Sequence, residues 1–304
     1  MTDTQNPNWV AVDWGTTHLR AWHLTASGTE LASAKSDKGM GRLSPDQFEA
    51  ALLDLIAPWL GDHMTTVIAC GMVGARQGWV EAPYRTVPCT PFDAGLIQAP
   101  TRDPRLRVFV IPGLCQTTPP DVMRGEETQV AGFLSLNEDF DGILCLPGTH
   151  TKWVHVSAGE VVSFQTFMTG ELFALLADHS VLRHSVLSEN SDDAAFADAV
   201  ADAIATPQTL AARLFSIRAD GLLNGLEPAT ARARLSGLLI GAELAAARPY
   251  WLGQQIAVIG SAALARAYVD ALGQQGAPAI LAAGNAMTLA GLTAARATPK
   301  DPSQ

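Results

Sequence analysis

Residues suited to binding a phosphate follow the first apolar segment of the chain. The segment Asp13-Trp14-Gly15-Thr16-Thr17 separates two apolar segments, which predicts a hairpin. At its tip Gly15 would let the backbone approach a ligand, and successive N–H groups with the Thr16 and Thr17 hydroxyls could bind an anion. Asp13 supplies a carboxylate for a hydrated Mg²⁺ beside a phosphate. Alone, this turn is equally consistent with an ordinary polar hairpin.

The same pattern recurs in the second half of the chain. Gly148-Thr149-His150-Thr151 follows the apolar segment 143–146 and precedes Lys152 and a further strand pattern. His150 could donate to a phosphate and Lys152 could contact the transferred phosphoryl group. A solvated turn histidine and an exposed strand lysine are the competing interpretations. Arg20, after the first turn, could likewise contact a phosphate or simply be an exposed strand residue. Two such hairpins, one in each half, indicate duplicated domains that hold a nucleotide between them.

Adjacent carboxylates provide candidates for the base that phosphoryl transfer to a hydroxyl requires. Glu126 and Glu127 follow Gly125 and open a predicted helix. Acidic residues in a first helical turn also stabilise the helix dipole, so a structural role is a competing explanation. Neighbouring helical residues point about 100° apart, so the two carboxylates cannot face one point equally. The sequence alone leaves the choice between them open.

The predicted elements alternate between strands and helices, and the candidate residues lie at their ends. A polar break at 137–142 predicts two domains, 1–138 and 139–304, with the last helix a candidate for the domain interface. The predicted strands are 10–14, 19–25, 29–37, 66–70, 107–111, 143–146, 161–168, 255–259 and 279–283, and the predicted helices are 45–60, 126–136, 170–177, 192–205, 207–217, 228–247, 262–273 and 285–296.

Composition and charge argue against several classes of protein. Hydrophobic residues make up 48% of the 304 residues, and the formal net charge of −10 disfavours a broad nucleic-acid surface. Cys70, Cys89, Cys115 and Cys145 show no C-x-x-C spacing and are expected to be buried thiols in a reducing compartment. The polar start lacks a signal-peptide core, and no apolar run has the length of a membrane span. We expect a cytoplasmic protein that binds neither nucleic acid nor membrane, with a frayed tail at 297–304.

Several longer segments resemble one family of kinases. They are IPGLC (111–115), VMRGEETQ (122–129), PGTHTKW (147–153), MTGEL (168–172), SGLLIGAE (236–243) and GMVG with the following GW and APY (71–84). The chain is similar in these segments to the bacterial 2-dehydro-3-deoxygalactonate kinases of the actin, Hsp70 and sugar-kinase superfamily. The resemblance implies an α/β fold of two ribonuclease H-like (actin-like ATPase) domains, each a mixed sheet flanked by helices, with a nucleotide cleft between them.

The resemblance also implies a reaction and roles for particular residues. The reaction is ATP- and Mg²⁺-dependent phosphorylation of 2-dehydro-3-deoxy-D-galactonate on its 6-hydroxyl. In hexokinase-like relatives an Asn-Asp pair opens the corresponding helix and its Asp is the base, which favours Glu127, with Glu126 the second candidate. Asp13 would organise the metal. The expected nucleotide-binding residues are Gly15, Thr16, Thr17, Gly148, Thr149, His150 and Lys152 for the phosphates and Gly260, Ser261 and Gly284 for adenosine.

Substrate contacts are expected mostly from the first half. The loops 71–76 and 78–84 are rich in glycine and aromatic residues, although such loops can also be irregular connections. An acidic substrate needs an arginine for its carboxylate. Arg42, Arg76 and Arg124 are the candidates, and Arg124 is preferred because it is close to Glu126 and Glu127 in the sequence. The predicted substrate-binding residues are Met72, Arg76, Trp79, Tyr84 and Arg124.

Other functions remain open at this point. A kinase of another 2-keto-3-deoxy sugar acid or of a hexose is the closest competitor. A nucleotide-dependent switch and a phosphohydrolase of the exopolyphosphatase type share the superfamily. The chain is short for a chaperone, which would add a peptide-binding domain, and its acidity disfavours a basic channel for polyphosphate. The expected partner is a small sugar acid, and a homodimer is possible.

Overall fold

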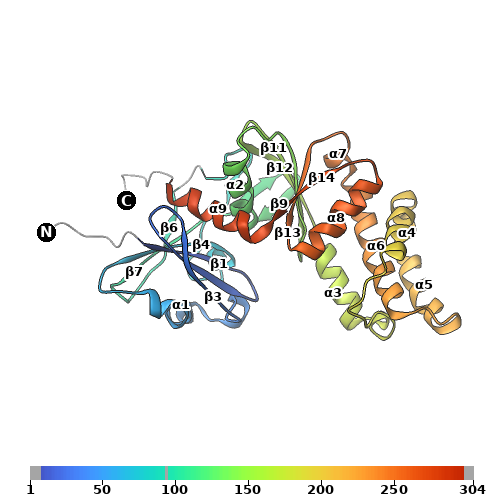
Figure 1. Cartoon of the computed structure of the whole chain (residues 1–304), viewed down its shortest axis with the longest axis horizontal. Helices are drawn as coiled ribbons and strands as arrows, with labels where there is room; N and C mark the ends of the chain where they lie inside the picture. Colours follow the sequence, from blue (N-terminus) through green and yellow to red (C-terminus); the bar gives the residue numbers. More distant parts are fainter. Residues whose placement is uncertain (1–7, 93–94, 298–304) are drawn as a thin grey trace. The chain divides into compact units, whose positions relative to one another are not determined.

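The computed structural model describes residues 8–92 and 95–297, so residues 298–304 of the expected tail lie outside the described part. The chain divides into two compact units, whose elements are labelled in Figure 1. Unit 1 comprises Met1–Phe140, Ser157–Ser163 and Gly284–Gln304, and unit 2 comprises Asp141–Val156 and Phe164–Ala283. The sequence-based boundary near residue 138 lies close to the first of these limits. The last helix, expected in the second domain, groups with unit 1.

A twisted mixed sheet forms the centre of unit 1, with strand order β3-β2-β1-β4-β7-β6. Strand β1 is antiparallel to β2 and parallel to β4, and β4 is parallel to β7. A small sheet of order β5-β8-β9 lies apart from it. The elements of unit 1 are β1 (Trp9–Trp14), β2 (Leu19–Leu24), β3 (Glu30–Ser36), η1 (Met40–Arg42), η2 (Pro45–Gln47), α1 (Phe48–Ile56), η3 (Ala57–Trp59), β4 (Thr65–Gly71), η4 (Met72–Gly74), β5 (Arg85–Thr86), β6 (Ile97–Gln98), β7 (Leu106–Val110), β8 (Leu114–Thr117), β9 (Pro120–Met123), α2 (Glu126–Leu136) and α9 (Gly284–Ala297).

Apolar side chains fill both faces of this sheet. Alternation along β1 sends Val10, Val12 and Trp14 into the cluster that includes helix α1, while Trp9 and Ala11 join the cluster that includes α9. Helix α9 packs on α2, β1 and β4. The sequence therefore gives β1 two buried faces, as expected for a central strand.

Glycines allow α2 and α9 to cross closely. A Cβ at Gly132 would lie 1.9 Å from the carbonyl oxygen of Met287, and a Cβ at Gly291 would lie 1.9 Å from that of Thr128. Gln129 adds a hydrogen bond from its Nε2 to Thr288 Oγ1 at 3.2 Å. This crossing fixes the first turn of α2, which carries the carboxylate pair.

The sheet of unit 2 repeats the arrangement, with order β12-β11-β10-β13-β14. Strand β10 is antiparallel to β11 and parallel to β13, and β13 is parallel to β14. The predicted fold class, two ribonuclease H-like mixed sheets with flanking helices, is confirmed. The elements are β10 (Gly142–Leu146), β11 (Thr151–Ser157), β12 (Glu160–Phe167), α3 (Thr169–His179), η5 (Val181–His184), α4 (Asp193–Ala205), η6 (Pro207–Thr209), α5 (Leu210–Leu223), α6 (Pro228–Ala246), α7 (Arg248–Trp251), β13 (Ile256–Gly260), α8 (Ala262–Gln274) and β14 (Ala279–Ala283).

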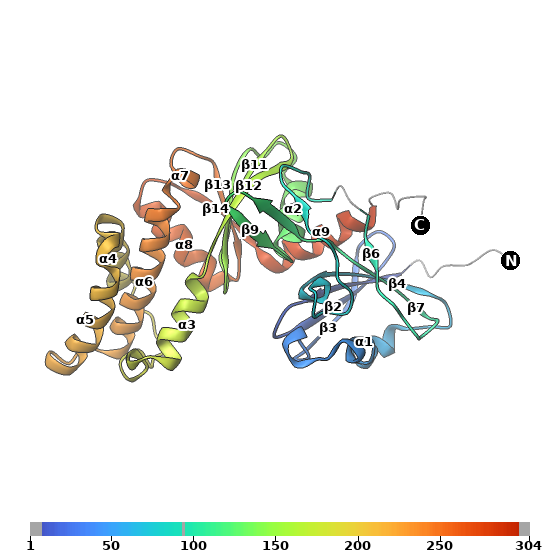
Figure 2. The same ribbon diagram turned by 180° about the vertical axis from the view of Figure 1, so that it is seen from behind.

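Helix α6 organises the helical part of unit 2, where it packs against α3, α4, α5 and α8 (Figure 2). Gly237 and Gly241 let α4 approach, since a Cβ at these positions would lie 2.5 Å from Phe196 O and 2.6 Å from Val200 O. Among the helices of the described residues, none has the length and apolar character that crossing a membrane requires. None of the four cysteines, which all lie in the described residues, forms a disulfide, and Cys89 and Cys115 are half-buried where full burial was expected.

Candidate functional site

The first hairpin tip is held through its carbonyl groups. Gly15 N–H donates to His18 O at 2.9 Å, and the N–H groups of residues 39–41 donate to the three carbonyls of residues 15–17 at 3.2, 3.0 and 2.9 Å. A Cβ at Gly39 would lie 2.2 Å from the carbonyl carbon of Thr17, so only glycine fits there. The side chains of Thr16 and Thr17 are exposed and are the groups that this tip offers to a ligand.

Asp13 lies at the end of β1, directly before this tip. Its side chain is 16% exposed and pairs with Arg20, which stands opposite on β2 and also donates to Asn285 Oδ1. Burial raises the pKa of Asp13, and the Arg20 charge opposes that rise. The adjacent end of β4 comes close because Gly71, at φ +93°, has no Cβ that would meet the Trp14 carbonyl.

One carboxylate of this kind fits a hydrated magnesium ion. The described residues contain no group of three or more His, Cys, Asp or Glu side chains that could hold a metal by themselves. Mg²⁺ commonly keeps several waters and is held by one or two carboxylates together with substrate phosphates. Asp13, directly before the first hairpin tip, could supply such a carboxylate.

The predicted carboxylate pair lies at the start of α2, where Gly125 takes φ +104° and a Cβ would lie 3.3 Å from Gly71 Cα. Glu127 is fully buried and accepts from Gly125 N–H at 2.6 Å and Thr128 Oγ1 at 3.0 Å. Burial, together with the Glu126 charge, raises the pKa of Glu127 to about 7. Glu126 is half-buried, accepts from Arg124 N–H at 3.1 Å, and its charge acts on Asp13. The two acids therefore differ in access to solvent.

Arg124 is a buried cation with unused donors. Its side chain is 9% exposed, and Nη2 donates to Ala82 O at 2.7 Å. Its Nε and Nη1 are buried and lack a hydrogen-bond partner. The guanidinium lies 4.3 Å from the centre of the Tyr84 ring, and Gly74 makes room for it because a Cβ there would lie 2.8 Å from Nη1. A planar anion such as a carboxylate is the ligand that these N–H groups lack.

The other predicted substrate residues lie in different surroundings. Met72 is half-buried in η4, next to Gly71. Trp79 is 8% exposed and packs edge-on against Trp14 in the core, with Nε1 bonded to Pro100 O at 3.0 Å, which leaves little of its indole for a ligand. Arg76 is 81% exposed and pairs with Glu81, and Arg42 pairs with Asp37 on the surface.

The second hairpin tip is also held through its carbonyls. Glu171 N–H donates to Thr149 O at 2.9 Å, and a Cβ at Gly170 would lie 2.2 Å from Gly148 O. The His150 ring pairs with the Glu171 carboxylate at 2.6 Å. Lys152 is 5% exposed, which excludes the alternative of an exposed strand lysine, and its Nζ donates to His150 O at 3.1 Å.

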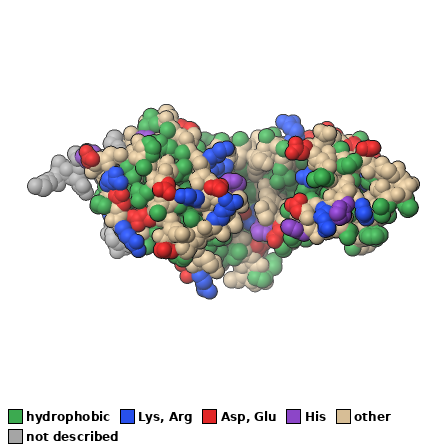
Figure 3. Space-filling model, turned by 90° about the horizontal axis from the view of Figure 1, so that it is seen from below, with side chains coloured by type: hydrophobic (Ala, Val, Ile, Leu, Met, Phe, Trp, Pro, Cys, Tyr) green, Lys and Arg blue, Asp and Glu red, His purple; other side chains and the backbone are tan. Residues whose placement is uncertain are grey.

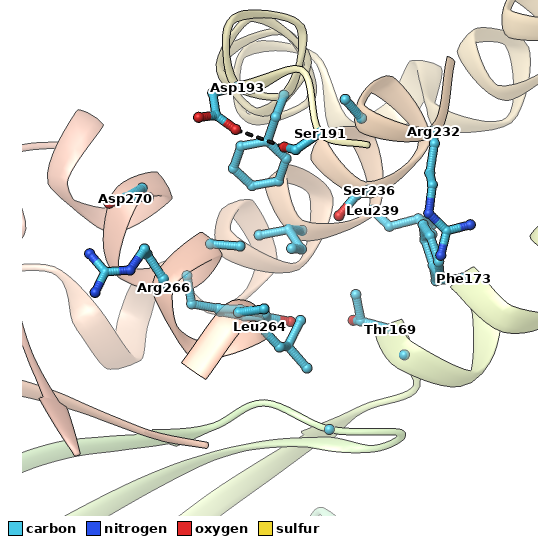
Figure 4. A pocket seen from close by; sticks show the side chains of 18 of the residues that line it. Thr169, Phe173, Ser191, Asp193, Arg232, Ser236, Leu239, Leu264, Arg266 and Asp270 are labelled. Atoms are coloured by element: carbon cyan, nitrogen blue, oxygen red, sulfur yellow. Dashed lines mark hydrogen bonds between the residues drawn. The ribbon is translucent and has the colours of Figure 1, made fainter. Parts of the chain in front are cut away.

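A cavity of about 850 Å³ opens beside this second tip, within unit 2. Figure 4 shows Thr169 and Phe173 of α3, Arg232 and Ser236 of α6, and Leu264 of α8 around it. Gly148 and Thr149 of the second tip also line it. The guanidinium of Arg232 lies 4.9 Å from the centre of the Phe173 ring. The cavity thus joins a phosphate-type turn to a space with apolar and polar walls, as nucleotide sites do.

The predicted adenosine residues lie near this cavity only in part. Gly260 and Ser261 do not line it, although Ala263 and Leu264 of the helix that follows them do. Gly284 is buried at the start of α9 in unit 1. The helix residues that line the cavity were not among the predicted site residues, although Thr169, Gly170, Ser236, Leu239 and Ile240 fall in the segments 168–172 and 236–243 that carry the family resemblance. Figure 3 shows acidic and basic side chains of the described residues interspersed over one face.

Comparison with known proteins gives one consistent result. A family model described as 2-keto-3-deoxy-galactonokinase matches residues 13–295. A Rhizobium meliloti protein named a probable 2-dehydro-3-deoxygalactonokinase is 39% identical over 293 residues, covering 94% of this chain and 96% of the relative. The 2-dehydro-3-deoxygalactonokinase of Escherichia coli is 35% identical over 287 residues, covering 93% and 96%. A crystal structure of a Sinorhizobium meliloti protein, named a putative 2-dehydro-3-deoxygalactonokinase, matches with a TM-score of 0.88 at 38% identity. The match covers 94% of this chain and 97% of the other.

Proposed function

Since this chain belongs to the 2-keto-3-deoxy-galactonokinase family, we propose that it phosphorylates 2-dehydro-3-deoxy-D-galactonate on the 6-hydroxyl with ATP, in galactonate breakdown. The main structural support for an acidic substrate is the environment of Arg124. A buried guanidinium with two unpartnered N–H positions, close to a carboxylate pair, suits a sugar acid better than a neutral sugar.

The proposed nucleotide site is the cavity of unit 2. Adenosine occupies the space between α3, α6 and α8, and the phosphates extend to Gly148 and Thr149, which also line the cavity. The buried Lys152 adds a cation next to this tip. In unit 1, Thr16 and Thr17 would bind phosphate oxygens, and Asp13 would hold Mg²⁺ through its water shell. Mg²⁺, when bound, neutralises charge on the phosphate oxygens.

The proposed acceptor site is the cluster at the start of α2. Arg124 binds the substrate carboxylate, with Tyr84 against the guanidinium. Glu126, the carboxylate with accessible surface, takes the proton from the 6-hydroxyl as its oxygen bonds to the γ-phosphorus and ADP leaves. Glu127 holds the helix start through Gly125 and Thr128. The sequence-based assignment of the base to Glu127 is the alternative.

A coupled assay of ADP release tests this function. The panel contains 2-dehydro-3-deoxy-D-galactonate, its stereoisomers among the 2-keto-3-deoxy acids, galactose and glucose. We expect turnover of the named acid to exceed that of the neutral sugars, and Asp13→Asn to abolish turnover while the protein stays folded. If the enzyme preferred another keto-deoxy acid, that acid would replace the proposed substrate. If it turned over galactose equally well, recognition of a carboxylate would be excluded. The cytoplasmic location and the homodimer remain predictions.

A further inference from the structure

Glu243 is a buried carboxylate that the proposed reaction does not use. It lies on α6 and is 3% exposed. Burying a charge is unfavourable unless hydrogen bonds replace its hydration. Burial raises the pKa of Glu243 to about 7, while donors on neighbouring elements act in the opposite direction. The hydrogen bonds from these donors connect the carboxylate to the elements around it.

Three side chains donate to this carboxylate, each from a different element. Trp153 Nε1 of β11 donates to Oε1 at 2.8 Å, and Tyr268 OH of α8 donates to Oε2 at 2.8 Å. Thr169 Oγ1, at the first residue of α3, also donates to Oε2. The Tyr268 hydroxyl lies 3.2 Å from Thr151 Oγ1, which adds a second link to β11. Glu243 therefore connects α6 to β11, α3 and α8 at once.

The same elements form the cavity of unit 2. Thr169 and Tyr268 line it, and Trp153 follows Lys152 just beyond the hairpin tip. The residue after Thr169 is Gly170, which touches Gly148 O, and Glu171 N–H donates to Thr149 O. A shift of Thr169 would therefore be passed to the second hairpin tip, whose Gly148 and Thr149 also line the cavity.

We infer that Glu243 is a positioning residue for nucleotide binding, which holds the start of α3 and the second hairpin tip in the geometry that receives the phosphates. The inference rests on the proposed function, because it takes the cavity as the nucleotide site. It predicts that damage to the Glu243 hydrogen bonds weakens nucleotide binding more than sugar-acid binding.

Four variants and one control separate this role from a general effect on folding. Glu243→Gln keeps the size of the side chain and an acceptor for Trp153, and its amide can donate to the two hydroxyls. Glu243→Leu removes all three hydrogen bonds. Thr169→Val removes only the link to α3, and Thr169→Ser retains it. Leu235→Ala is the control, because Leu235 is fully buried on the same helix but does not line the cavity.

The readouts are the Kd for ADP by calorimetry, the KM for the sugar acid and the thermal midpoint. Glu243→Leu and Thr169→Val should raise the ADP Kd by roughly tenfold or more, while the sugar-acid KM changes less than about twofold. Glu243→Gln and Thr169→Ser should stay within about threefold of wild type. Leu235→Ala should lower the thermal midpoint and leave the ADP Kd unchanged.

Each other outcome counts against the inference. If Thr169→Val binds ADP as wild type does, the inference is overturned, and this variant decides the matter where Glu243→Leu does not fold. An equal loss of affinity in Leu235→Ala would show that instability alone explains the effect. If wild type phosphorylates the acid and the variants bind ADP normally, only this inference fails. If wild type binds no ADP, the proposed function fails with it.

Discussion

Replacing Arg124 with methionine should remove the preference for an acidic substrate. The guanidinium makes one hydrogen bond, to Ala82 O, and leaves Nε and Nη1 for a ligand. A hydrogen bond to a charged group contributes about 1.5–3 kcal/mol, and each 1.4 kcal/mol corresponds to about a tenfold change in a binding or rate constant. We therefore expect kcat/KM for the keto-deoxy acid to fall roughly ten- to a hundredfold, whereas the low value for galactose changes little. Arg124→Lys should retain part of the preference, since a point charge cannot bond in two places at once.

Stability provides an independent check on the same variant. A buried cation without an anionic partner is unfavourable, so Arg124→Met should not lower the thermal midpoint. Arg85 is the matched control, because its guanidinium donates to the carbonyls of Thr90 and Pro91 and so has a structural role. Arg85→Met should lower the midpoint without changing the preference for acid. The reasoning is refuted if Arg124→Met still prefers the acid by the wild-type ratio, or if Arg76→Met causes the same loss.

Two further predictions concern the acidic residues of α2 and α6. Glu126→Gln should lower kcat by about 10²–10⁴-fold, and Glu127→Gln should cost less, in steady-state assays at saturating substrates; the reverse order would return the base to Glu127. The free energy of unfolding should fall as pH rises from about 4.5 through 7, because burial raises the pKa values of Glu127 and Glu243 from 4.5 to about 7 and ionisation then opposes folding. Each group contributes roughly 3 kcal/mol to this fall. In urea titrations, the difference in the free energy of unfolding between pH 5 and pH 8 should be smaller for Glu127→Gln than for wild type. A free energy of unfolding that rises with pH over this window would contradict the argument.

The sequence predicted the features of this fold that depend on local patterns. Apolar segments around 10–14 and 143–146 with a Gly-Thr turn gave both central hairpins, and these became β1–β2 and β10–β11. The helix expected at 207–217 instead runs from Leu210 to Leu223, because Pro207 begins a short 3-10 turn before it. The short strands β5, β6, β8 and β9 were missed, since two to four residues carry too little periodicity to identify.

Features that depend on packing between distant segments were not predictable. The sequence of 285–296 predicted a helix but did not identify the element it packs against. That element is α2, which α9 approaches closely at Gly132 and Gly291. Adjacent glutamates look alike in a sequence, and burial against the end of β4 separates Glu127 from Glu126. Trp79 looked like a loop aromatic and proved to be a core residue. The helical lining of the cavity comes from α3, α4, α6 and α8, which are separated along the chain and are brought together only by packing.

The two hairpin tips share a feature that explains why a Gly-Thr turn alone is a weak signal. A backbone turn can bind an anion only when its carbonyl groups, which repel anions, are directed elsewhere and are hydrogen-bonded. At the first tip the N–H groups of residues 39–41 donate to three carbonyls of the turn, and at the second tip Glu171 N–H donates to Thr149 O; each time a glycine lies against the turn, Gly39 against Thr17 and Gly170 against Gly148. Each tip therefore consists of a turn and a later supporting segment, and a substitution at Gly39 or Gly170 would displace the turn without changing its own residues.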